Sequence, residues 1–490
     1  MDDSTRIDIG GVSVPCGHLI GGRRVGAGAA DPYEVSSPID GSVLGHIPCA
    51  GAAEVEAAVA AAAAAFPAWA ALGPEGRGEI LDRFADAIVA RMPDLQMVDA
   101  HDHGSLLAGR GGHGMPRAAL NVKFFSDWAR SMDHPTIDGP EASNSVRFDP
   151  AGVAALIVPW NAPLMLGTWK IGPALAAGNT VVVKPPEFAP FSLSLLGEIA
   201  QQAGVPDGVL NIVHGTGAVA GDALVRHPKV SRISFTGSPA TARVIAGAAA
   251  SNLTPVSFEL GGKSPFVVCA DADLKAAART ISLQFMNAGQ VCLAGTRLLV
   301  EESIVDELLP MVLAEVDKMV VGDPRDPGTR IGPLIHPTHF AKVKGLVERA
   351  IADGARVVCG GGPHPDGGLY FLPTILTDVD QRSEIVQTEV FGPVLTLQTW
   401  SDEQEMLELA NDTIYGLAAT VFTSDADRAE RITSQLVAGT VWTNCFYVRD
   451  LAAPFGGSRQ SGIGREGGNW SFDFFCDIKN IATRKGTFTA

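Results

Sequence analysis

Three short apolar runs decide the fold: VAALIV at 153–158, VVV at 181–183 and LNIV at 210–213. The stretches 164–175 and 193–203 lie between these runs, and each has the length and apolar spacing of a helix. Continuous Val- and Ile-rich strands that alternate with helices are typical of a parallel sheet with both faces covered. The sequence therefore predicts an α/β unit whose ligands lie at the carboxyl ends of the strands.

Polar motifs follow these strands at the points where ligands are expected. Pro159, Trp160 and Asn161 follow the first strand, and Lys-Pro-Pro-Glu at 184–187 follows the second. A glycine group comes after the third strand, at Gly215, Gly217 and Gly221. A fourth strand at 232–235 runs into Thr236, Gly237, Ser238 and a helix, where backbone N–H groups could meet a phosphate. Glycine is also common in any tight turn from strand to helix, so the glycine group alone is a weak signal.

A second α/β pattern begins after Glu259, with strands expected at 266–269, 394–397 and 418–422. It contains the loop 287–292, Asn-Ala-Gly-Gln-Val-Cys, between a helix-like run and a strand-like run. A single cysteine is more often buried and inert than catalytic. The small residues around Cys292 would nevertheless let an incoming carbonyl reach its sulfur, so we treat Cys292 as a candidate nucleophile.

Length and composition limit the possible classes of protein. A chain of 490 residues exceeds one hydrophobic core, so at least two domains are expected. A net charge of −17 and a pI near 5.1 argue against nucleic acid or an anionic membrane as a partner. The seven cysteines show no C-x-x-C spacing, residues 1–10 resemble no signal peptide, and no apolar run reaches the roughly 20 residues of a membrane span. We expect reduced thiols in the cytoplasm.

The N-terminal part is less informative. Residues 1–35 suggest only short strands, and helices are expected at 54–65, ending near Pro67, and at 80–89. The segment 101–114 is rich in glycine and contains three histidines, His101, His103 and His113. A metal site is conceivable there, but a solvated loop is favoured because the histidines lack a fixed ligand spacing. No metal is expected.

Several motifs together resemble the aldehyde dehydrogenase superfamily, in family order from about Ser36 to the C-terminus. They are the Cys292 loop, Glu-Leu-Gly-Gly-Lys at 259–263, Phe-Thr-Gly-Ser at 235–238 and Glu-Val-Phe-Gly-Pro at 389–393. The resemblance implies a Rossmann-like NAD-binding domain from 1–130 and 149–258, and an α/β catalytic domain at 259–470. It also implies a small β oligomerisation arm from 131–148 and 471–490, and hence a homodimer or homotetramer.

The resemblance implies a role for each candidate catalytic residue. Cys292 would attack the aldehyde to give a thiohemiacetal and then a thioester, with Asn161 and the Cys292 N–H holding the oxyanion. Glu259 would act as general base, and Lys184 would belong to both the catalytic and the cofactor site. Two alternatives stay open: Asn161 could only cap the helix that starts near Pro163, and Glu259 could be a paired core carboxylate.

The resemblance also implies a cofactor site. Lys184 and Glu187 would reach the adenine ribose, where a carboxylate favours NAD over NADP. Glu187 could instead be an acid at a helix start, which would leave NADP open. Ser238 would contact a phosphate, Glu389 the nicotinamide ribose, and Trp160 and Phe391 the nicotinamide. The full expected set is Ile157, Trp160, Lys184, Glu187, Gly217, Phe235, Gly237, Ser238, Leu260, Glu389 and Phe391.

Two further stretches narrow the expected substrate. Val-Arg-Asp-Leu at 448–451 and Met-Pro-Arg-Ala at 115–118 resemble the 2-hydroxymuconate, 2-aminomuconate and carboxymethyl-hydroxymuconate semialdehyde dehydrogenases. Arg117 and Arg449 would then hold a substrate carboxylate, because guanidinium binds carboxylate bidentately. Surface salt bridges are the alternative for both arginines. A neutral aldehyde, release of the acyl group to coenzyme A and a non-catalytic member are the other possibilities; Glu259 as water activator favours hydrolysis.

Overall fold

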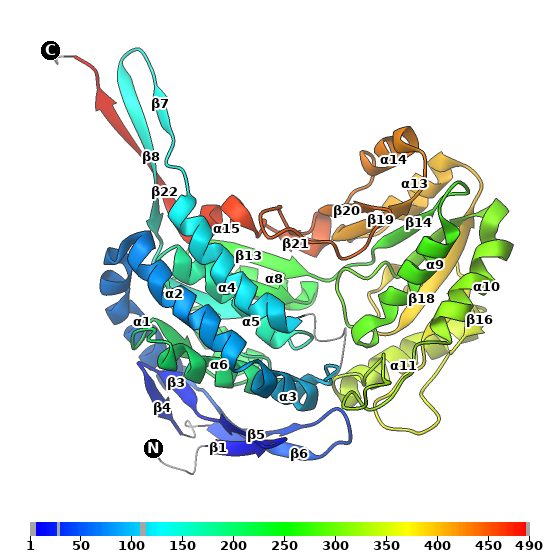
Figure 1. Ribbon diagram of the computed structural model, residues 1–490, viewed down its shortest axis with the longest axis horizontal. Helices are drawn as coiled ribbons and strands as arrows, with labels where there is room; N and C mark the ends of the chain where they lie inside the picture. Colours follow the sequence, from blue (N-terminus) through cyan, green and yellow to red (C-terminus); the bar gives the residue numbers. More distant parts are fainter. Residues whose placement is uncertain (1–5, 27–29, 108–113, 487–490) are drawn as a thin grey trace.

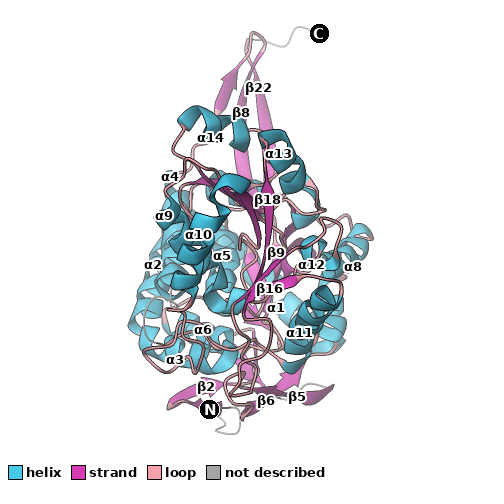
Figure 2. Ribbon diagram, turned by 90° about the vertical axis from the view of Figure 1, so that its right-hand side faces the viewer, coloured by secondary structure: helices cyan, strands magenta, loops and turns pink. Residues whose placement is uncertain are grey.

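The computed structural model describes residues 6–26, 30–107 and 114–486. Two large sheets, each flanked by helices, lie side by side, and a narrow three-stranded arm extends away from them (Figures 1 and 2). The α/β class predicted from the sequence is confirmed, with a first sheet of eight strands and a second of seven.

The first sheet follows the order β21-β13-β12-β9-β10-β11-β3-β4. Its five central strands are parallel: β9 (Val153–Ile157), β10 (Thr180–Lys184), β11 (Leu210–Ile212), β12 (Val230–Gly237) and β13 (Val256–Leu260). Three short strands pair antiparallel at its edges: β3 (His18–Ile20), β4 (Arg23–Val25) and β21 (Gly462–Ile463).

Both faces of this sheet are covered, as the continuous apolar runs predicted. Leu156, Val181 and Val183 pack in a core with α5 (Pro163–Ala176) and α6 (Phe191–Gln202). Their neighbours Ala155 and Val182 face the other way, into a core with α1 (Ala52–Ala71) and α8 (Pro239–Ala250). Because successive residues of a strand point to opposite faces, a strand covered on both sides must be apolar throughout.

Two expectations for the N-terminal part are wrong. Helix α1 does not end near Pro67 but continues to Ala71. Its last turn is fixed by Trp69, which is buried and donates from Nε1 to the Leu175 oxygen at 3.1 Å, so tertiary packing outweighs the single backbone bond that proline removes. After α2 (Gly73–Ala90), His101 and His103 lie on α3 (Met92–His103) and not in a solvated loop.

The polar residues at the end of α3 have partners inside the protein. His103 is buried, with Nε2 3.6 Å from an Asp99 oxygen one turn earlier. Asp102 accepts a hydrogen bond from the Phe191 N–H at the start of α6. Gly104 then ends the helix in a left-handed conformation, with φ of 78°. His113 lies outside the described residues.

The second sheet follows the order β16-β17-β18-β15-β14-β19-β20. Its strands are β14 (Pro265–Val268), β15 (Arg297–Glu301), β16 (Arg356–Cys359), β17 (Thr374–Thr377), β18 (Val394–Trp400), β19 (Ala418–Phe422) and β20 (Thr440–Thr443), with β16 alone antiparallel. Helices α9 (Leu274–Ser282), α10 (Val305–Val316), α11 (Pro337–Ala352), α13 (Glu403–Asn411) and α14 (Ala426–Thr433) flank it.

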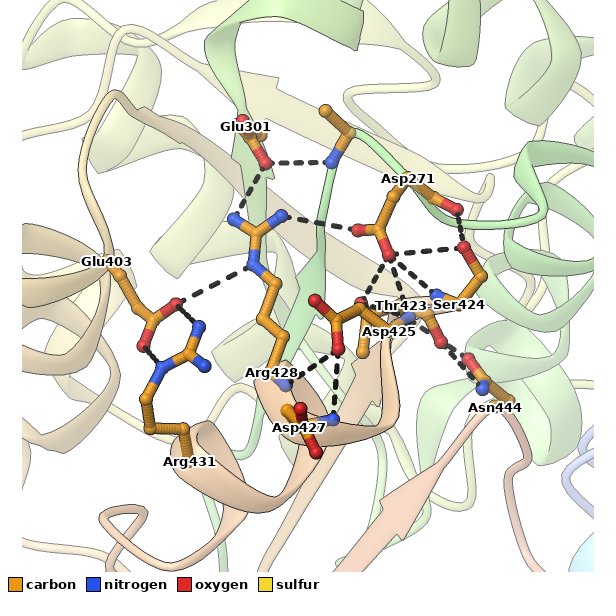
Figure 3. Close-up of polar contacts among 11 residues, drawn as sticks. Asp271, Glu301, Glu403, Thr423, Ser424, Asp425, Asp427, Arg428, Arg431 and Asn444 are labelled. Carbon is orange, nitrogen blue, oxygen red and sulfur yellow. Dashed lines mark hydrogen bonds and ion pairs between the residues drawn. The ribbon is translucent and has the colours of Figure 1, made fainter.

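An ion-pair network closes the carboxyl end of this second sheet (Figure 3). Arg428 on α14 contacts Asp271 after β14, Glu301 at the end of β15 and Glu403 on α13. Cys292, in contrast, precedes β15 and therefore lies toward the amino end of the sheet. The second sheet thus departs from the usual placement of ligands at strand carboxyl ends, which the first sheet follows.

The arm consists of β7 (Thr136–Asp138), β8 (Ala142–Pro150) and β22 (Cys476–Arg484), all antiparallel. Strand β13 crosses the expected domain division at 258/259, and β21 returns from the far end of the chain to pair with it. The division of the chain into domains at fixed residue numbers stays a prediction.

The remaining elements complete the body. They are β1 (Arg6–Ile9), β2 (Val12–Pro15), β5 (Ala30–Ser36), β6 (Val43–Cys49), α4 (Gly114–Ser131), α7 (Asp222–Val225), α12 (Glu384–Gln387) and α15 (Gly468–Phe475), with short 3-10 and π segments between them. Within the described residues, no single helix is long and apolar enough to cross a membrane; α1 and α2 meet that test only as a pair, which is bent by 114°.

Candidate active site

The Cys292 loop is a sharp reversal built from small residues. Asn287, Ala288 and Gly289 all have left-handed φ angles, 53°, 53° and 68°. A Cβ on Gly289 would lie 2.1 Å from the Gly392 oxygen, so only glycine fits there. Gln290 is buried and fixes the loop: its Oε1 accepts from the Ile335 N–H at 2.9 Å, and its Nε2 donates to the Asn287 oxygen at 3.0 Å.

Asn161 belongs to this loop through its side chain. Its Nδ2 donates to the Gln290 oxygen at 3.0 Å, and the Asn287 Nδ2 donates to the Asn161 oxygen at 2.9 Å. Helix α5 has Ala162 at its N-cap and no side-chain cap hydrogen bond. The alternative that Asn161 caps this helix is therefore wrong, and its amide donor lies beside the candidate nucleophile.

One cavity of about 850 Å³ brings several predicted residues together. It is lined by Asn161 in the loop after β9, Glu259 in β13 and Cys292 before β15, so both sheets contribute. Trp169, Arg449 and Phe455 line the same cavity. Arg117 is not among the lining residues, and the cofactor candidates predicted from the sequence lie elsewhere.

Glu259 and Cys292 are both shaped by burial. Glu259 is 5% exposed, and within the described structure neither of its carboxylate oxygens has a hydrogen-bond partner. Burial, and then the negative charge of Glu466, raise the Glu259 pKa well above its ordinary value. Burial also raises the pKa of the Cys292 thiol to about 12, and the charges of Glu389 and Glu259 act in the same direction. The resting site therefore holds a protonated thiol near a carboxyl group that has no hydrogen-bond partner among the described residues. The alternative that Glu259 is a paired core carboxylate is wrong.

A second group of buried polar residues lies next to Glu259. Lys170 on α5 donates from Nζ to Glu466 Oε1 at 3.0 Å and to Ser234 Oγ at 2.8 Å. Trp169 donates from Nε1 to the other oxygen, Glu466 Oε2, at 2.6 Å. The sequence motifs assigned no role to Lys170, Trp169 or Glu466. A lysine inside the apolar run 163–176 was the signal that could have found Lys170, because a fully buried lysine needs a partner; it does not identify Glu466.

The predicted adenine-ribose residues join the ends of two strands. Lys184 donates from Nζ to the Pro185 oxygen at 2.7 Å and to the Gly215 oxygen at 3.1 Å, and burial lowers its pKa to about 8. Glu187 accepts a short hydrogen bond from the Gly217 N–H. The Glu187 carboxylate is thus fixed at the carboxyl ends of β10 and β11.

Five more cofactor candidates lie at the carboxyl ends of the central strands of the first sheet. Ile157 pairs with Phe235 across β9 and β12, and Gly237 pairs with Leu260 across β12 and β13. Ser238 follows as the N-cap of α8, where its Oγ accepts from the Thr241 N–H at 3.2 Å. The N-terminus of α8 therefore lies at the carboxyl end of β12, where its backbone N–H groups could bind an anion.

The last three candidates bridge the two sheets. Trp160, after β9, meets Phe391 with ring centroids 5.2 Å apart at an angle of 83°. Glu389 accepts from the Gly262 N–H at 3.0 Å, and burial raises its pKa to about 7. Together these residues place a carboxylate at Glu187, the N-terminus of α8 and an aromatic wall near the strand ends. This set fits a dinucleotide laid along the strand ends.

The two arginines occupy neighbouring, partly buried positions. The Arg449 guanidinium carbon lies 3.7 Å from the Phe455 ring centroid and 5.0 Å from that of Trp169. Arg117 donates from Nη1 to the Arg449 oxygen at 3.4 Å, while its Nη2 is buried without a partner in the described structure. Burial, and then the charge of Arg449, lower the Arg117 pKa. Since neither arginine forms an ion pair with a described residue, the surface salt-bridge alternative is wrong.

That the protein binds no metal stays a prediction from the sequence. Within residues 6–26, 30–107 and 114–486, no group of three or more His, Cys, Asp or Glu side chains is arranged to hold a metal ion. The four candidate catalytic residues lie in two places. Asn161, Glu259 and Cys292 line the cavity, whereas Lys184 lies at the carboxyl end of β10 with the cofactor candidates.

Comparison with known proteins gives the family. Residues 26–481 match the aldehyde dehydrogenase family. The chain is 44% identical to a 2-hydroxymuconic semialdehyde dehydrogenase of Pseudomonas sp. strain CF600, covering 95% of this chain and 99% of the relative. It is 42% identical to a 2-aminomuconic semialdehyde dehydrogenase of Danio rerio, covering 97% of each.

Solved structures agree with these relatives. HpcC from Thermus thermophilus superposes with a TM-score of 0.94 at 40% identity, covering 97% of this chain and 94% of that one. A mutant of the P. syringae indole-3-acetaldehyde dehydrogenase AldA, in complex with NAD+ and IAA, gives 0.94 at 36% identity and covers 97% of each. The chain therefore belongs to the aldehyde dehydrogenase family and is an NAD(P)-dependent oxidoreductase that acts on aldehydes.

Proposed function

We propose that this enzyme oxidises a carboxylate-bearing semialdehyde of the muconic type to the corresponding acid, with NAD as the hydride acceptor. One observation carries the proposal: Arg449 lines the cavity of Cys292 with its guanidinium against two aromatic rings and without an acidic partner among the described residues. Arg449 is partly buried, so its charge is partly desolvated, and a substrate carboxylate would supply its missing partner. The similarity to 2-hydroxymuconic and 2-aminomuconic semialdehyde dehydrogenases supports this proposal.

The geometry supports an acylation step at Cys292. Glu259 would take the thiol proton, and the Cys292 sulfur would then add to the aldehyde carbon. Asn161 would turn its Nδ2 from the Gln290 oxygen, where it now lies at 3.0 Å, toward the developing oxyanion. NAD, when bound, supplies the acceptor for the hydride that leaves this carbon, and the thioester on Cys292 remains.

Hydrolysis of the thioester needs a base at the same place. Glu259 is the unpartnered carboxylate of the cavity, and it would remove a proton from the attacking water. Because its pKa is raised, the base form becomes populated at a higher pH than that of an ordinary glutamate. We propose that Glu259 serves both steps, with a proton release between them.

We propose NAD rather than NADP as the preferred cofactor. Glu187 carries a negative charge at the expected position of the adenine ribose and is fixed there by the Gly217 N–H. A carboxylate at that position accepts from a free 2′-hydroxyl and repels a 2′-phosphate. NAD+ in the complex of the P. syringae relative agrees with this preference.

The arginines provide the direct test. We expect Arg449→Ala to lower kcat/KM for a muconic-type semialdehyde by about 10- to 150-fold, which corresponds to the roughly 1.5–3 kcal/mol of a charged hydrogen bond. Arg117→Ala should lower it less, because Arg117 does not line the cavity and acts through its hydrogen bond to the Arg449 oxygen. Arg449→Lys keeps the charge without the fork and should fall between wild type and Arg449→Ala. An uncharged aldehyde such as benzaldehyde is the control, and its kcat/KM should change little. Equal losses for both substrate types would reject the acid-binding role.

We further propose that the enzyme is a homodimer or homotetramer held by its arm, and that it works in the cytoplasm. The arm projects from the body (Figure 1). It exposes Ile137, Ile478 and Ile481, which are 62%, 54% and 40% accessible. Exposed apolar side chains on an edge strand suit pairing with a second copy of the chain. The seven cysteines are all free thiols, which agrees with a reducing compartment.

A further inference from the structure

Two charged residues that line the cavity are held by the same pair of aromatic residues. The Arg449 guanidinium lies against the rings of Trp169 and Phe455. Glu466 lines the same cavity as Glu259 and lies within electrostatic range of it. Both residues whose rings support Arg449 are also bonded to Glu466. Trp169 reaches its Oε2 with the indole N–H, and Phe455 exchanges two backbone hydrogen bonds with it, each of 2.7 Å.

We infer that Trp169 is a positioning residue that serves substrate recognition and thioester hydrolysis at once: its ring supports the carboxylate-binding Arg449, and its N–H fixes the carboxylate of Glu466 next to the general base Glu259. The first half of this inference rests on the proposed substrate class, and the second half rests on the proposed role of Glu259 as base. The second half concerns hydrolysis of any acyl group on Cys292, whether or not the substrate carries a carboxylate.

Burial makes this arrangement effective. Trp169 is 4% exposed, Lys170 1% and Glu466 6%, so water competes little for the carboxylate oxygens. The indole N–H and the Lys170 ammonium take one oxygen each, at 2.6 and 3.0 Å, and this fixes the plane of the carboxylate. Electrostatic effects between neighbouring charges are strong in such a site, so a small displacement of Glu466 changes the proton affinity of Glu259.

The charged and titratable groups around Glu259 act in opposite directions. Glu466 raises its pKa, whereas Lys170, Arg449 and Arg465 lower it, and the Cys292 thiol shares the cavity. Of these groups, Glu466 and Arg449 both contact Trp169 directly. A change at Trp169 can therefore alter the Glu259 pKa through the positions of Glu466 and Arg449, which carry opposite charges. Trp169 need not contact Glu259 itself.

Two substitutions separate the two roles of Trp169. Trp169→Phe removes the N–H donor and keeps a ring for Arg449 to stack on, whereas Trp169→Leu removes both. Steady-state turnover after the NADH burst, measured from pH 5.5 to 9 with a neutral aldehyde, reports the state of Glu259. For Trp169→Phe we expect the pH of half-maximal turnover to move by at least about 0.5 unit. We also expect a ratio of kcat/KM between acid-bearing and neutral aldehydes that stays within about twofold of wild type.

Phe455→Leu is the matched control. It removes the other ring over Arg449 and keeps the backbone bonds to Glu466, so it should lower the acid-to-neutral ratio at least about threefold and leave the pH midpoint in place. Trp169→Leu should show both changes. Thermal melting and NAD titration by fluorescence verify that each variant is folded.

A double-variant cycle tests whether Trp169 acts through Glu466. Glu466→Gln keeps the acceptor shape without the charge and should move the pH midpoint downward, since the charge of Glu466 raises the Glu259 pKa. Adding Trp169→Phe to Glu466→Gln should then cause little further shift. Additive shifts, an unchanged midpoint in Glu466→Gln, or a wild-type profile in Trp169→Phe would overturn the inference. These results are independent of the arginine test. If wild type shows no preference for acid-bearing aldehydes, the proposed substrate class is rejected, and the shifts of the pH midpoint still decide whether Trp169 acts on Glu259 through Glu466.

Discussion

Cys292 is the candidate nucleophile, and burial determines how its thiol can react. Burial keeps its thiol protonated, with a pKa of about 12, so a nearby base and a bound aldehyde must act together to create the nucleophile. We expect Cys292→Ala to lower kcat at least about 10³-fold, as removal of a nucleophile does in other enzymes. NAD titration should give nearly the wild-type affinity. Wild-type turnover in this variant would remove Cys292 from the mechanism.

Glu259 gives the second prediction at the residue scale. Glu259→Gln keeps the shape of the side chain and cannot accept a proton, so hydrolysis should slow more than hydride transfer. Stopped-flow absorbance should show a burst of NADH followed by a steady state at least about 100-fold slower than in wild type.

The pH dependence follows from the sign of the pKa shift. Burial raises the Glu259 pKa, so a fall in pH protonates the base and wild-type turnover drops through the acidic range, while Glu259→Gln should lose this acidic limb. A variant with a wild-type steady state and an intact acidic limb would leave Glu259 without a base role.

Single residues differ in how far the sequence predicts them. Cys292 and Gln290 belong to one local motif, and the structure shows why the motif needs small residues and a glutamine. Lys170 and Glu466 are 296 positions apart, and nothing local marks them as partners. The placement of Arg117 behind Arg449, bonded to its backbone oxygen and not at the cavity wall, likewise depends on a contact across 332 positions.

At the scale of elements, strands are predicted best where both faces are buried. All residues of β9 and β10 are buried, so their apolar runs carry an unambiguous signal. Helix α3 was missed because its sequence is polar, and what stabilises its end is the bond from the Phe191 N–H to Asp102, 89 positions away. Sequence composition cannot show that a polar residue has found a buried partner.

The network around Arg428 gives a prediction about stability (Figure 3). Asp271 Oδ2 accepts from the Thr423 hydroxyl and from the N–H groups of Ser424 and Asp425. Asp271→Asn removes the charge that binds Arg428 and weakens these bonds, so we expect a loss of about 1–3 kcal/mol and an apparent melting temperature lower by a few degrees. Glu430→Gln is the control, because Glu430 lies on the same helix as Arg428 and outside this network.

The pH dependence of this loss has a definite direction. Hydrogen bonds hold the Asp271 pKa at about 2, below its ordinary value of 3.8, so its contribution is complete above that ordinary value and disappears as the pH falls toward 2. The difference in melting temperature between wild type and Asp271→Asn should therefore be constant from about pH 8 to 5 and shrink below about pH 4. A constant difference at every pH would show that the carboxylate charge is not responsible.

The ends of β10 and β11 give a prediction about cofactor choice. Glu187→Gln removes the negative charge and keeps an acceptor for the Gly217 N–H. We expect the ratio of kcat/KM for NADP to that for NAD to rise about 10-fold, because repulsion of the 2′-phosphate is lost. Turnover read from NADH or NADPH absorbance with both cofactors measures the ratio. An unchanged ratio would assign cofactor choice to other residues.

At the scale of the whole molecule, the active site exists only because two sheets meet. Asn161 and Glu259 come from the first sheet, Cys292 precedes a strand of the second, and Arg449 follows the edge strand β20. The net charge of −17 offers an anionic substrate no general attraction, so a substrate of the proposed class would depend on local cations such as Arg449. The sequence predicted both sheets, but the cavity between them depends on how they pack.

The arm leads to the last prediction, which concerns assembly. Ile481 lies on β22, an edge strand of the arm whose residues after Cys476 are all exposed, and an exposed sheet edge of this kind is a ready site for pairing with a second copy. If a second copy covers it, a charge placed there would be buried without a counterion, which is strongly unfavourable. We expect Ile481→Asp to reduce the mass in solution below that of wild type, which should be two or four times 51.1 kDa by light scattering. Ile351→Asp on α11 is the matched control, since Ile351 and Ile481 are both 40% exposed. A wild-type mass for Ile481→Asp, or an equal loss in both variants, would reject the arm as the subunit interface.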